Sequence, residues 1–380
     1  MKESDFAPIP GSTILNSIAG KKMIIMAANT RITTVVQGIF RAAKDTDSAV
    51  FMELARSESD LKGGYTGLTP KAYSERVKHT AIDVEFDAWA LHADHITIKT
   101  GDNKEIDDTK KLIDAQIEAG YTSFAIDASH LFNFKGKNPK EELDKNIQVT
   151  TLLAKYIEDG MKGREFGLEV EVGEIGRKDK HGLVLTKPEE AVTFIKALNE
   201  NDVYPQVLAI ANGSVHGHVY DEHGNVIEQL SIDIPQTKAV AKALRDNNLK
   251  VGIAQHGITG TPRELINLHF PKGDIIKGNV GTFWQDIVLN VLKVYEPELY
   301  KDIWNWTLEN YREKNPSKKD IQIFDSNCKY AIKEFFSRIY SIDEDTEKAI
   351  MAMAYAESLM FFKAFSSSGS ASLVRDTMNK

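Results

Sequence analysis

The apolar stretch Phe86-Asp87-Ala88-Trp89-Ala90 runs directly into Leu91-His92-Ala93-Asp94-His95. A short apolar strand that ends in an acid and two imidazoles is typical of α/β folds, which keep their chemistry at strand ends. Side chains alternate along a strand, so we expect His92 and Asp94 to point to one face and His95 to the other. This separation predicts His95 as a metal ligand and Asp94 as a proton carrier; a local His–Asp hydrogen bond is the alternative interpretation.

Apolar runs of this kind recur along the chain and alternate with longer amphipathic stretches. The eight runs cover residues 23–27, 49–54, 89–91, 123–126, 168–172, 206–210, 251–254 and 274–276. Thr69, Thr186 and Thr261 stand one or two residues before a proline, as capping residues do at helix N-termini. Alternating strands and helices indicate parallel βαβ units. Eight such units predict an α/β protein of the (β/α)8 TIM-barrel type, with a doubly wound sheet as the alternative.

The pattern changes after about Thr282, where the apolar runs give way to long helix-like stretches. Residues 285–300, 301–314, 329–340 and 343–365 are predicted to be helical. We therefore expect a barrel domain over residues 1–285 and a helical C-terminal extension over residues 286–380. This extension is expected to cover one barrel face or to form a subunit contact.

The bulk composition argues against several classes of protein. The 380 residues carry a formal net charge of −8, whereas a nucleic-acid surface needs clustered Lys and Arg. Cys328 is the single cysteine, so no disulfide can form within the chain, which fits the reducing cytoplasm. The N-terminus lacks the apolar region of a signal peptide, and no run approaches the ~18 apolar residues of a membrane span. We expect a cytoplasmic protein without a membrane or nucleic-acid partner.

Polar side chains stand on or just after the predicted strands, where the ends of parallel barrel strands meet at one mouth. The three imidazoles of His95, His216 and His256 come from separate strands. Such a set suits a divalent cation such as Zn²⁺, with one coordination position left open.

Carboxylates also come to this mouth. Asp127 ends one strand, and Glu169 and Glu171 lie on one face of the next. Burying carboxylates is costly unless charges or hydrogen bonds compensate. A second cation shared by Asp127 and Glu171 would do so, and a salt bridge to a lysine or arginine is the alternative.

The turns after the last three strands are rich in glycine, hydroxyl and amide groups. Barrels commonly bind phosphate in these loops, through backbone N–H groups. We therefore predict a phosphate cradle, with tight turns as the alternative reason for the glycines. Its residues would be Gly217, Gly257, Thr259, Gly260, Asn279 and Thr282.

Five motifs, in order, resemble those of the class II, metal-dependent fructose-bisphosphate aldolases. They are His92-Ala93-Asp94-His95, Glu169-Val170-Glu171-Val172-Gly173, Gly213-Ser214-Val215-His216-Gly217, His256-Gly257-Ile258-Thr259-Gly260 and Asn279-Val280-Gly281-Thr282. Together they span about residues 20–285. The resemblance implies a divergent family member in which His95, His216 and His256 hold zinc and Asp94 is the acid/base. It also implies a second cation near Asp127 and Glu171, and substrate contacts from Asn29 and Gly281.

The resemblance implies reversible cleavage of a phosphorylated ketose, by default fructose 1,6-bisphosphate, into dihydroxyacetone phosphate and an aldehyde. The zinc ion would stabilise the enediolate, and Asp94 would exchange a proton with the aldehyde oxygen. We also expect a homodimer or a larger homo-oligomer. A zinc-dependent barrel hydrolase and a non-catalytic, aldolase-like assembly subunit are the alternatives.

The chain departs from the family pattern at several positions. The loop after the fifth strand, residues 173–180, lacks the usual Gly-Gly-x-Glu-Asp, so Asp179 or Glu174 is predicted to supply its catalytic acid. Ala55 stands where relatives have serine, and Asp325-Ser326-Asn327 replaces the Asp-Pro-Arg that contacts a second phosphate. Lys329 and Arg56 are candidate replacements for that arginine. These departures leave another phosphorylated ketose open as the substrate.

Overall fold

A closed barrel of eight parallel strands forms the centre of the molecule, in the order β1-β12-β11-β8-β5-β4-β3-β2. The computed structural model describes residues 2–174, 178–179, 182–215, 217–221 and 224–379. Each of the eight predicted apolar runs contributes one strand, which confirms the TIM barrel and excludes the doubly wound sheet. The strands are β1 (Ile25–Asn29), β2 (Val50–Ala55), β3 (Trp89–Thr97), β4 (Ser123–Asp127), β5 (Gly167–Glu171), β8 (Val207–Ala209), β11 (Gly252–Gln255) and β12 (Ile275–Val280).

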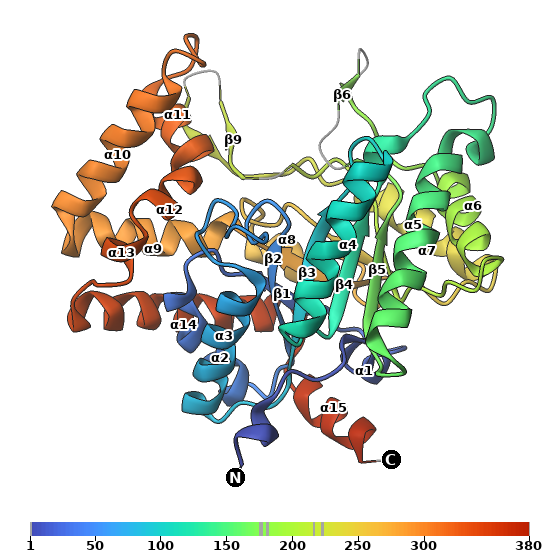
Figure 1. The fold of residues 1–380 in the computed structure, drawn as a ribbon, viewed down its shortest axis with the longest axis horizontal. Coiled ribbons are helices and arrows are strands. Elements are labelled where there is room, and N and C mark those ends of the chain that lie inside the picture. Colours follow the sequence, from blue (N-terminus) through green and yellow to red (C-terminus); the bar gives the residue numbers. More distant parts are fainter. Residues whose placement is uncertain (1, 175–177, 180–181, 216, 222–223, 380) are drawn as a thin grey trace.

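Two short hairpins extend from the barrel. They pair β6 (Lys178–Asp179) with β7 (Gly182–Leu183) and β9 (Val219–Tyr220) with β10 (Val226–Ile227). Figure 1 shows β6 and β9 at one end of the barrel and both chain termini at the opposite end. The hairpins follow the carboxyl ends of β5 and β8, so this end is the mouth.

A β-bulge interrupts β3 within the motif His92-Ala93-Asp94-His95. Asp94 and His95 stand opposite one residue of β4, Ala125, because the register shifts between Ala93 and Ile96. His95 takes φ 37°, a left-handed conformation that is uncommon outside glycine. The expected alternation of side chains is therefore wrong at this point. Asp94 contacts Asn279 of β12, and His95 contacts His256, which directly follows β11.

Helices surround the strands and bury the apolar core between the two layers. The outer ring holds α2 (Val36–Asp45), α3 (Pro70–Val84), α4 (Asn103–Glu118), α5 (Pro139–Met161), α6 (Pro188–Asn199), α7 (Ile234–Asp246) and α8 (Arg263–His269). The short helices are η1 (Glu3–Phe6), α1 (Gly11–Ser17), η2 (Thr33–Val35), η3 (Ser129–Leu131) and η4 (Cys328–Tyr330). Helix α1 packs against β3 and β5 at the end opposite the mouth.

One of the three predicted helix caps is confirmed. The hydroxyl of Thr69 accepts a hydrogen bond from the Ala72 N–H at the start of α3. The Thr186 hydroxyl instead accepts from the Ala211 N–H, and that of Thr261 accepts from the Gln229 side chain. Both hydroxyls serve neighbouring loops rather than a helix end.

The C-terminal region is helical, as predicted. It contains α9 (Thr282–Tyr295), α10 (Pro297–Tyr311), α11 (Asp320–Asn327), α12 (Ala331–Glu334), α13 (Phe336–Ile339), α14 (Glu344–Phe365) and α15 (Ser370–Met378). Helix α14 packs on α2, α8, α9 and β1, and thereby takes the place of the eighth outer helix. Helix α9 crosses residue 285, and the division of the chain at that residue stays a prediction. Among the described residues no helix has the length and apolar character to cross a bilayer.

Candidate metal and substrate site

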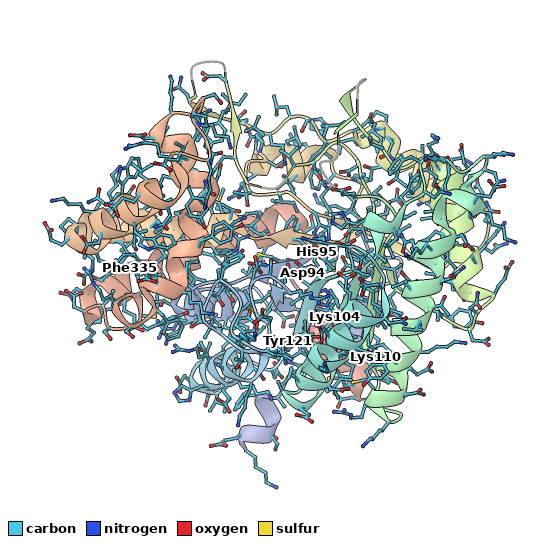
Figure 2. The ribbon with its side chains drawn as sticks, turned by 45° about the horizontal axis from the view of Figure 1, so that its top comes forward. Asp94, His95, Lys104, Lys110, Tyr121 and Phe335 are labelled. Atoms are coloured by element: carbon cyan, nitrogen blue, oxygen red, sulfur yellow. The ribbon has the colours of Figure 1, made fainter. Side chains whose placement is uncertain are left out.

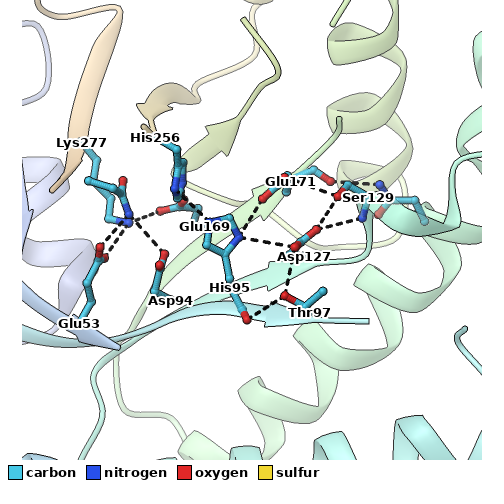
Figure 3. Close-up of polar contacts among 12 residues, drawn as sticks. Glu53, Asp94, His95, Thr97, Asp127, Ser129, Glu169, Glu171, His256 and Lys277 are labelled. Atoms are coloured by element: carbon cyan, nitrogen blue, oxygen red, sulfur yellow. Dashed lines mark hydrogen bonds and ion pairs between the residues drawn. The ribbon is translucent and has the colours of Figure 1, made fainter. Parts of the chain in front are cut away.

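His95 is the centre of a polar cluster at the barrel mouth. Figure 2 labels Asp94 and His95 near the middle of the molecule, and Figure 3 shows their surroundings. The Nε2 atom of His95 lies 3.0 Å from Nδ1 of His256. On its other side, Nδ1 of His95 lies 3.1 Å from Oε2 of Glu171 and 3.5 Å from Oδ2 of Asp127. The structure thus brings four of the predicted metal-site residues together from β3, β4, β5 and the end of β11.

The ionisable groups of this cluster shift one another's pKa values. Burial alone would lower the pKa of His95, but Asp94, Glu171 and Asp127 outweigh it and raise that pKa well above its usual value. Burial and the neighbouring Asp127 raise the pKa of Glu171 to about 8. Burial opposes ionisation of Asp127 as well, yet hydrogen bonds from His95 and Ser129 lower its pKa. The neighbouring acids therefore favour the charged form of the His95 imidazole.

A second polar layer lies beneath this cluster and was largely missed from the sequence. The Lys277 ammonium lies 2.8 Å from Oε2 of Glu169 and 3.2 Å from Oε2 of Glu53. The same ammonium lies 3.2 Å from Nε2 of His92, whose Nδ1 is 2.7 Å from the Ser123 hydroxyl. For Glu169, the salt bridge to a lysine that was considered as an alternative is present.

The two layers meet at His256, which hydrogen bonds through Nε2 to Oε1 of Glu169 at 3.1 Å. Burial lowers the pKa of His256, and the nearby His95 lowers it further. Burial also lowers the pKa of His92, so its imidazole is neutral. The opposite holds for Lys277: burial works against its charge, but Glu169 and Glu53 raise its pKa.

The donor set fits a divalent cation. Each imidazole contacts a carboxylate through one nitrogen, which is the usual way a metal-binding histidine is oriented. The other nitrogens, Nε2 of His95 and Nδ1 of His256, face each other at 3.0 Å. Two nitrogens bound tetrahedrally to zinc would lie ~3.3 Å apart. Asp94 completes a compact group with these two imidazoles. The third predicted ligand, His216, lies outside the described residues.

The predicted phosphate cradle lines the same cavity. The lining includes all its described residues except Gly260, whose carbonyl instead accepts from the Gln229 N–H. Gly257 needs to be glycine, because its φ is 67° and a Cβ would stand 2.5 Å from the Val215 carbonyl oxygen. Thr282 begins α9 after Gly281, so the positive end of that helix dipole faces the cavity. The lining residues from the prediction are Asn29, Gly217, Gly257, Thr259, Asn279, Gly281 and Thr282.

Comparison with known proteins agrees with this geometry. Residues 10–341 match the family model for class II fructose-bisphosphate aldolases. The chain belongs to this family. It is 25% identical to the fructose-bisphosphate aldolase of Staphylococcus epidermidis over 278 residues, which cover 70% of this chain and 80% of that one. The Geobacillus stearothermophilus enzyme is 26% identical over 274 residues, covering 71% and 79% of the two chains.

Solved structures show the same fold at lower identity. The YdjI aldolase of Escherichia coli K12 has a TM-score of 0.58 at 17% identity, with 96% of this chain and 99% of that chain covered. Fructose-bisphosphate aldolase from Campylobacter jejuni also has a TM-score of 0.58, at 16% identity, with coverages of 96% and 97%. The resemblance based on the five motifs is confirmed by the family match, and the chain is a divergent member of the class II fructose-bisphosphate aldolase family.

The residues at which this chain departs from the family pattern lie at different distances from the cavity. Arg56 points away from the cavity, since its guanidinium donates to the Thr97 carbonyl and to the Thr109 hydroxyl beside α4. Lys329 lines a wider outer pocket of about 790 Å³, which adjoins the inner cavity. The backbone of Asp179 lies in β6, and its side chain is outside the described residues. Glu174 lies 3.7 Å from the His130 imidazole.

Arg31 and Glu58 are functional candidates that sequence reasoning missed. They form a buried ion pair of 2.8 Å and line both the inner cavity and the outer pocket. A guanidinium nitrogen of Arg31 also lies 3.4 Å from the Thr282 hydroxyl, in the predicted cradle. Arg31 stands two residues after Asn29, so its nearness to a predicted substrate contact was the one available signal.

Proposed function

We propose that this aldolase reversibly cleaves a phosphorylated ketose into dihydroxyacetone phosphate and an aldehyde. Fructose 1,6-bisphosphate is the default substrate. The observation that carries the proposal is that Asp94, His95 and His256 line one cavity together with the glycine- and hydroxyl-rich cradle. A zinc hydrolase would need the metal group and a base, but it would leave the cradle without a ligand.

Asp94 is the proposed proton carrier. Its carboxylate is buried and accepts a hydrogen bond from the Asn279 amide at 3.3 Å. It can therefore hold or release a proton at the oxygen of the aldehyde fragment as the carbon–carbon bond breaks or forms. Asn279 keeps the carboxylate aimed at the cavity in both directions of the reaction.

His95 and His256, with His216, are the proposed zinc ligands. A bound divalent cation would polarise the ketose carbonyl as a Lewis acid. Glu171 contacts Nδ1 of His95, and Glu169 contacts Nε2 of His256. Each carboxylate thereby fixes the orientation of its imidazole ring. We keep a second cation near Asp127 and Glu171 as part of the proposal, because the oxygens of both acids converge beside His95.

The cradle is proposed to hold the phosphate of the dihydroxyacetone phosphate half. The N-terminus of α9 and the hydroxyls of Thr259 and Thr282 supply donors, and Arg31 supplies a fixed positive charge beside Thr282. The outer pocket would receive the aldehyde half. We further propose a cytoplasmic homo-oligomer, at least a dimer.

A coupled assay for dihydroxyacetone phosphate tests the function. Fructose 1,6-bisphosphate and other ketose 1-phosphates are supplied to the enzyme before chelation, after chelation, and after zinc is returned. We expect cleavage of at least one substrate, its loss on chelation, and its recovery with zinc. Absence of cleavage for every substrate, despite stoichiometric bound metal, would reject an aldolase and favour a non-catalytic family member.

A further inference from the structure

Two buried asparagines at the mouth each carry an amide oxygen without a partner. Asn29 ends β1 and Asn279 lies on β12, with 5% and 6% of their surfaces exposed. Both line the inner cavity. Within the described part of the chain, neither Oδ1 atom receives a hydrogen bond. Buried polar atoms normally have a partner, so this pair points to donors on a ligand.

Glu58 determines which way the Asn29 amide faces. The Asn29 Nδ2 atom donates to Oε2 of Glu58 at 2.5 Å. Glu58 also accepts from the Ala55 N–H at 2.7 Å, the Tyr65 hydroxyl at 2.7 Å and Nε of Arg31 at 2.8 Å. Burial alone would raise the pKa of Glu58, but Arg31 and these hydrogen bonds lower it below its usual value. An ionised carboxylate can only accept, so the NH2 group must face Glu58 and the oxygen must face the cavity.

Glu53 lies beside Asn279 in a similar position, but burial and the neighbouring Asp94 raise the pKa of Glu53 to about 8, so the contacts around the Asn279 amide decide its orientation. The Asn279 Nδ2 atom donates to Oε1 of Glu53 at 2.9 Å and to Oδ1 of Asp94 at 3.3 Å. The second oxygen of Glu53 lies 3.2 Å from the Lys277 ammonium, which holds the carboxylate in place. With two acids on its NH2 side, this amide also presents its oxygen to the cavity.

We propose that Glu58 and Glu53 are positioning residues that turn the amide oxygens of Asn29 and Asn279 into the cavity. The site then offers two fixed acceptors, and the ligand that fits it donates two hydroxyl hydrogens. This inference rests on the proposed function and deepens it, because it assigns to these two acids the control of which ligand groups the amides accept. A deoxy analogue would leave one buried acceptor unpaired, which is a strong basis for discrimination.

Side-chain amide exchange tests the orientation without any need for activity. In ¹⁵N-asparagine-labelled enzyme, the NH2 signals of Asn29 and Asn279 should exchange with D2O at least about 100-fold more slowly than that of exposed Asn16. Glu58→Gln should remove the slow exchange at Asn29 only, and Glu53→Gln at Asn279 only, so each variant is the other's control. Glu190→Gln, a buried glutamate of α6, should change neither. Fast exchange of both amides in the unsubstituted enzyme would overturn the proposal, even if a variant fails to fold.

Acceptor specificity tests the demand for hydroxyls. In the addition direction, dihydroxyacetone phosphate is combined with glyceraldehyde, 3-hydroxypropanal or lactaldehyde, and kcat/KM is compared. The unsubstituted enzyme should prefer glyceraldehyde over at least one deoxy acceptor by about tenfold, and the preference should fall below about threefold in Glu58→Gln or Glu53→Gln. Equal preference in all three enzymes would overturn the inference. If no acceptor reacts, the proposed function fails, and amide exchange still decides the orientation.

Discussion

The bulge at Asp94 and His95 lets adjacent residues serve one cavity in different ways. In a regular strand one of the two side chains would point into the layer of helices. With the extra residue, Asp94 reaches Asn279 while His95 reaches His256, on the same side of the sheet. The left-handed backbone of His95 stores strain, which is common where a side chain must be aimed at a functional site.

The substitution Asp94→Ala tests whether Asp94 is a proton carrier or a metal ligand. We expect the variant to keep its zinc, because the proposed ligands His95, His216 and His256 are unchanged, and to lose turnover by at least ~10²-fold. Metal content by elemental analysis and the coupled assay measure the two effects. Loss of the metal together with activity would identify Asp94 as a ligand, as its position beside His95 and His256 permits.

Lys277→Met tests the buried layer beneath the site. Lys277 is 1% exposed and is the cation shared by Glu53 and Glu169. Removing one partner from a buried ion pair typically costs about 3–5 kcal/mol, and we expect that loss in urea unfolding. The double variant Lys277→Met/Glu169→Gln should recover part of it, because only Glu53 is then left without the cation. An unchanged unfolding midpoint in the single variant would contradict this account.

The sequence predicted the site residues that stand at strand ends, because parallel strands bring those ends together. It did not predict Glu53 or Lys277, since Glu53 is embedded in an apolar run and Lys277 directly follows one, so that each reads as part of a strand. Nor could it predict that His95 turns inward. That depends on the pairing of β3 with β4, which no local pattern encodes. Glu58 and Arg31 lie in connecting segments, where spacing carries no signal.

Helices α2 and α14 approach each other closely at Gly38. A Cβ atom there would stand 2.4 Å from the Met351 carbonyl oxygen and 2.8 Å from the Ala354 Cβ. Alanine is the better helix former by about 1 kcal/mol, but overpacking against backbone costs about 1–3 kcal/mol. We therefore expect Gly38→Ala to destabilise the protein by up to roughly 2 kcal/mol in urea unfolding.

Gly160→Ala is the matched control, because Gly160 is also helical and its nearest obstacle is the end of the Ile117 side chain. That side chain can move, so this substitution should be neutral or stabilising by up to about 1 kcal/mol. Equal effects of the two substitutions would mean that the α2–α14 contact is not tight.

Helix α15 is tied to the barrel by Arg375, which pairs with Asp87 at 2.6 Å and with Asp47 at 2.9 Å. Hydrogen bonding to Arg375 lowers the pKa of Asp87 below its usual 3.8. The stabilisation is thus present above pH 3.8 and is lost as the pH falls through the lower, folded-state pKa. Because the groups are partly exposed, we expect Arg375→Met to cost only about 0.5–1 kcal/mol at pH 7.

The difference in unfolding free energy between Arg375→Met and the unsubstituted protein should shrink in acid. It should also shrink in 1 M salt, where the Debye length is only ~3 Å and exposed ion pairs are screened. Urea unfolding at several pH values measures it. A difference that stays constant with pH would assign the effect of Arg375 to packing alone.

At the level of elements, the eight strands and most helices could be predicted, because the apolar period is set locally. The errors in the predicted helix boundaries and caps have identifiable physical causes. The predicted helix 285–300 instead ends at Tyr295, since Pro297 disfavours helical backbone in the preceding residue. Thr186 and Thr261 stand where helix caps are expected, but their hydroxyls accept hydrogen bonds from residues that are distant in sequence.

The C-terminal helices complete the barrel rather than stand beside it. Helix α14 covers β1 and lies against α2 and α8, and its Phe361, Phe362 and Phe365 have no exposed surface. The sequence separated these helices from the barrel because the pattern changes after about Thr282. That pattern does not tell which surface the helices cover. A boundary at residue 285 would leave the first strand and its helix without their neighbour.

A chain that ends at residue 343 tests whether α14 is part of the barrel core. Each buried phenylalanine contributes about 1.5–3 kcal/mol, so the loss of three is comparable to the whole stability of a domain, about 5–15 kcal/mol. We expect the shortened chain to lack a cooperative unfolding transition by circular dichroism and to aggregate in size-exclusion chromatography. A chain that ends at residue 369 keeps α14, loses only α15, and should stay folded with reduced stability. A folded, cooperative 1–343 chain would instead make α14 an accessory helix and would support a division of the molecule near residue 285.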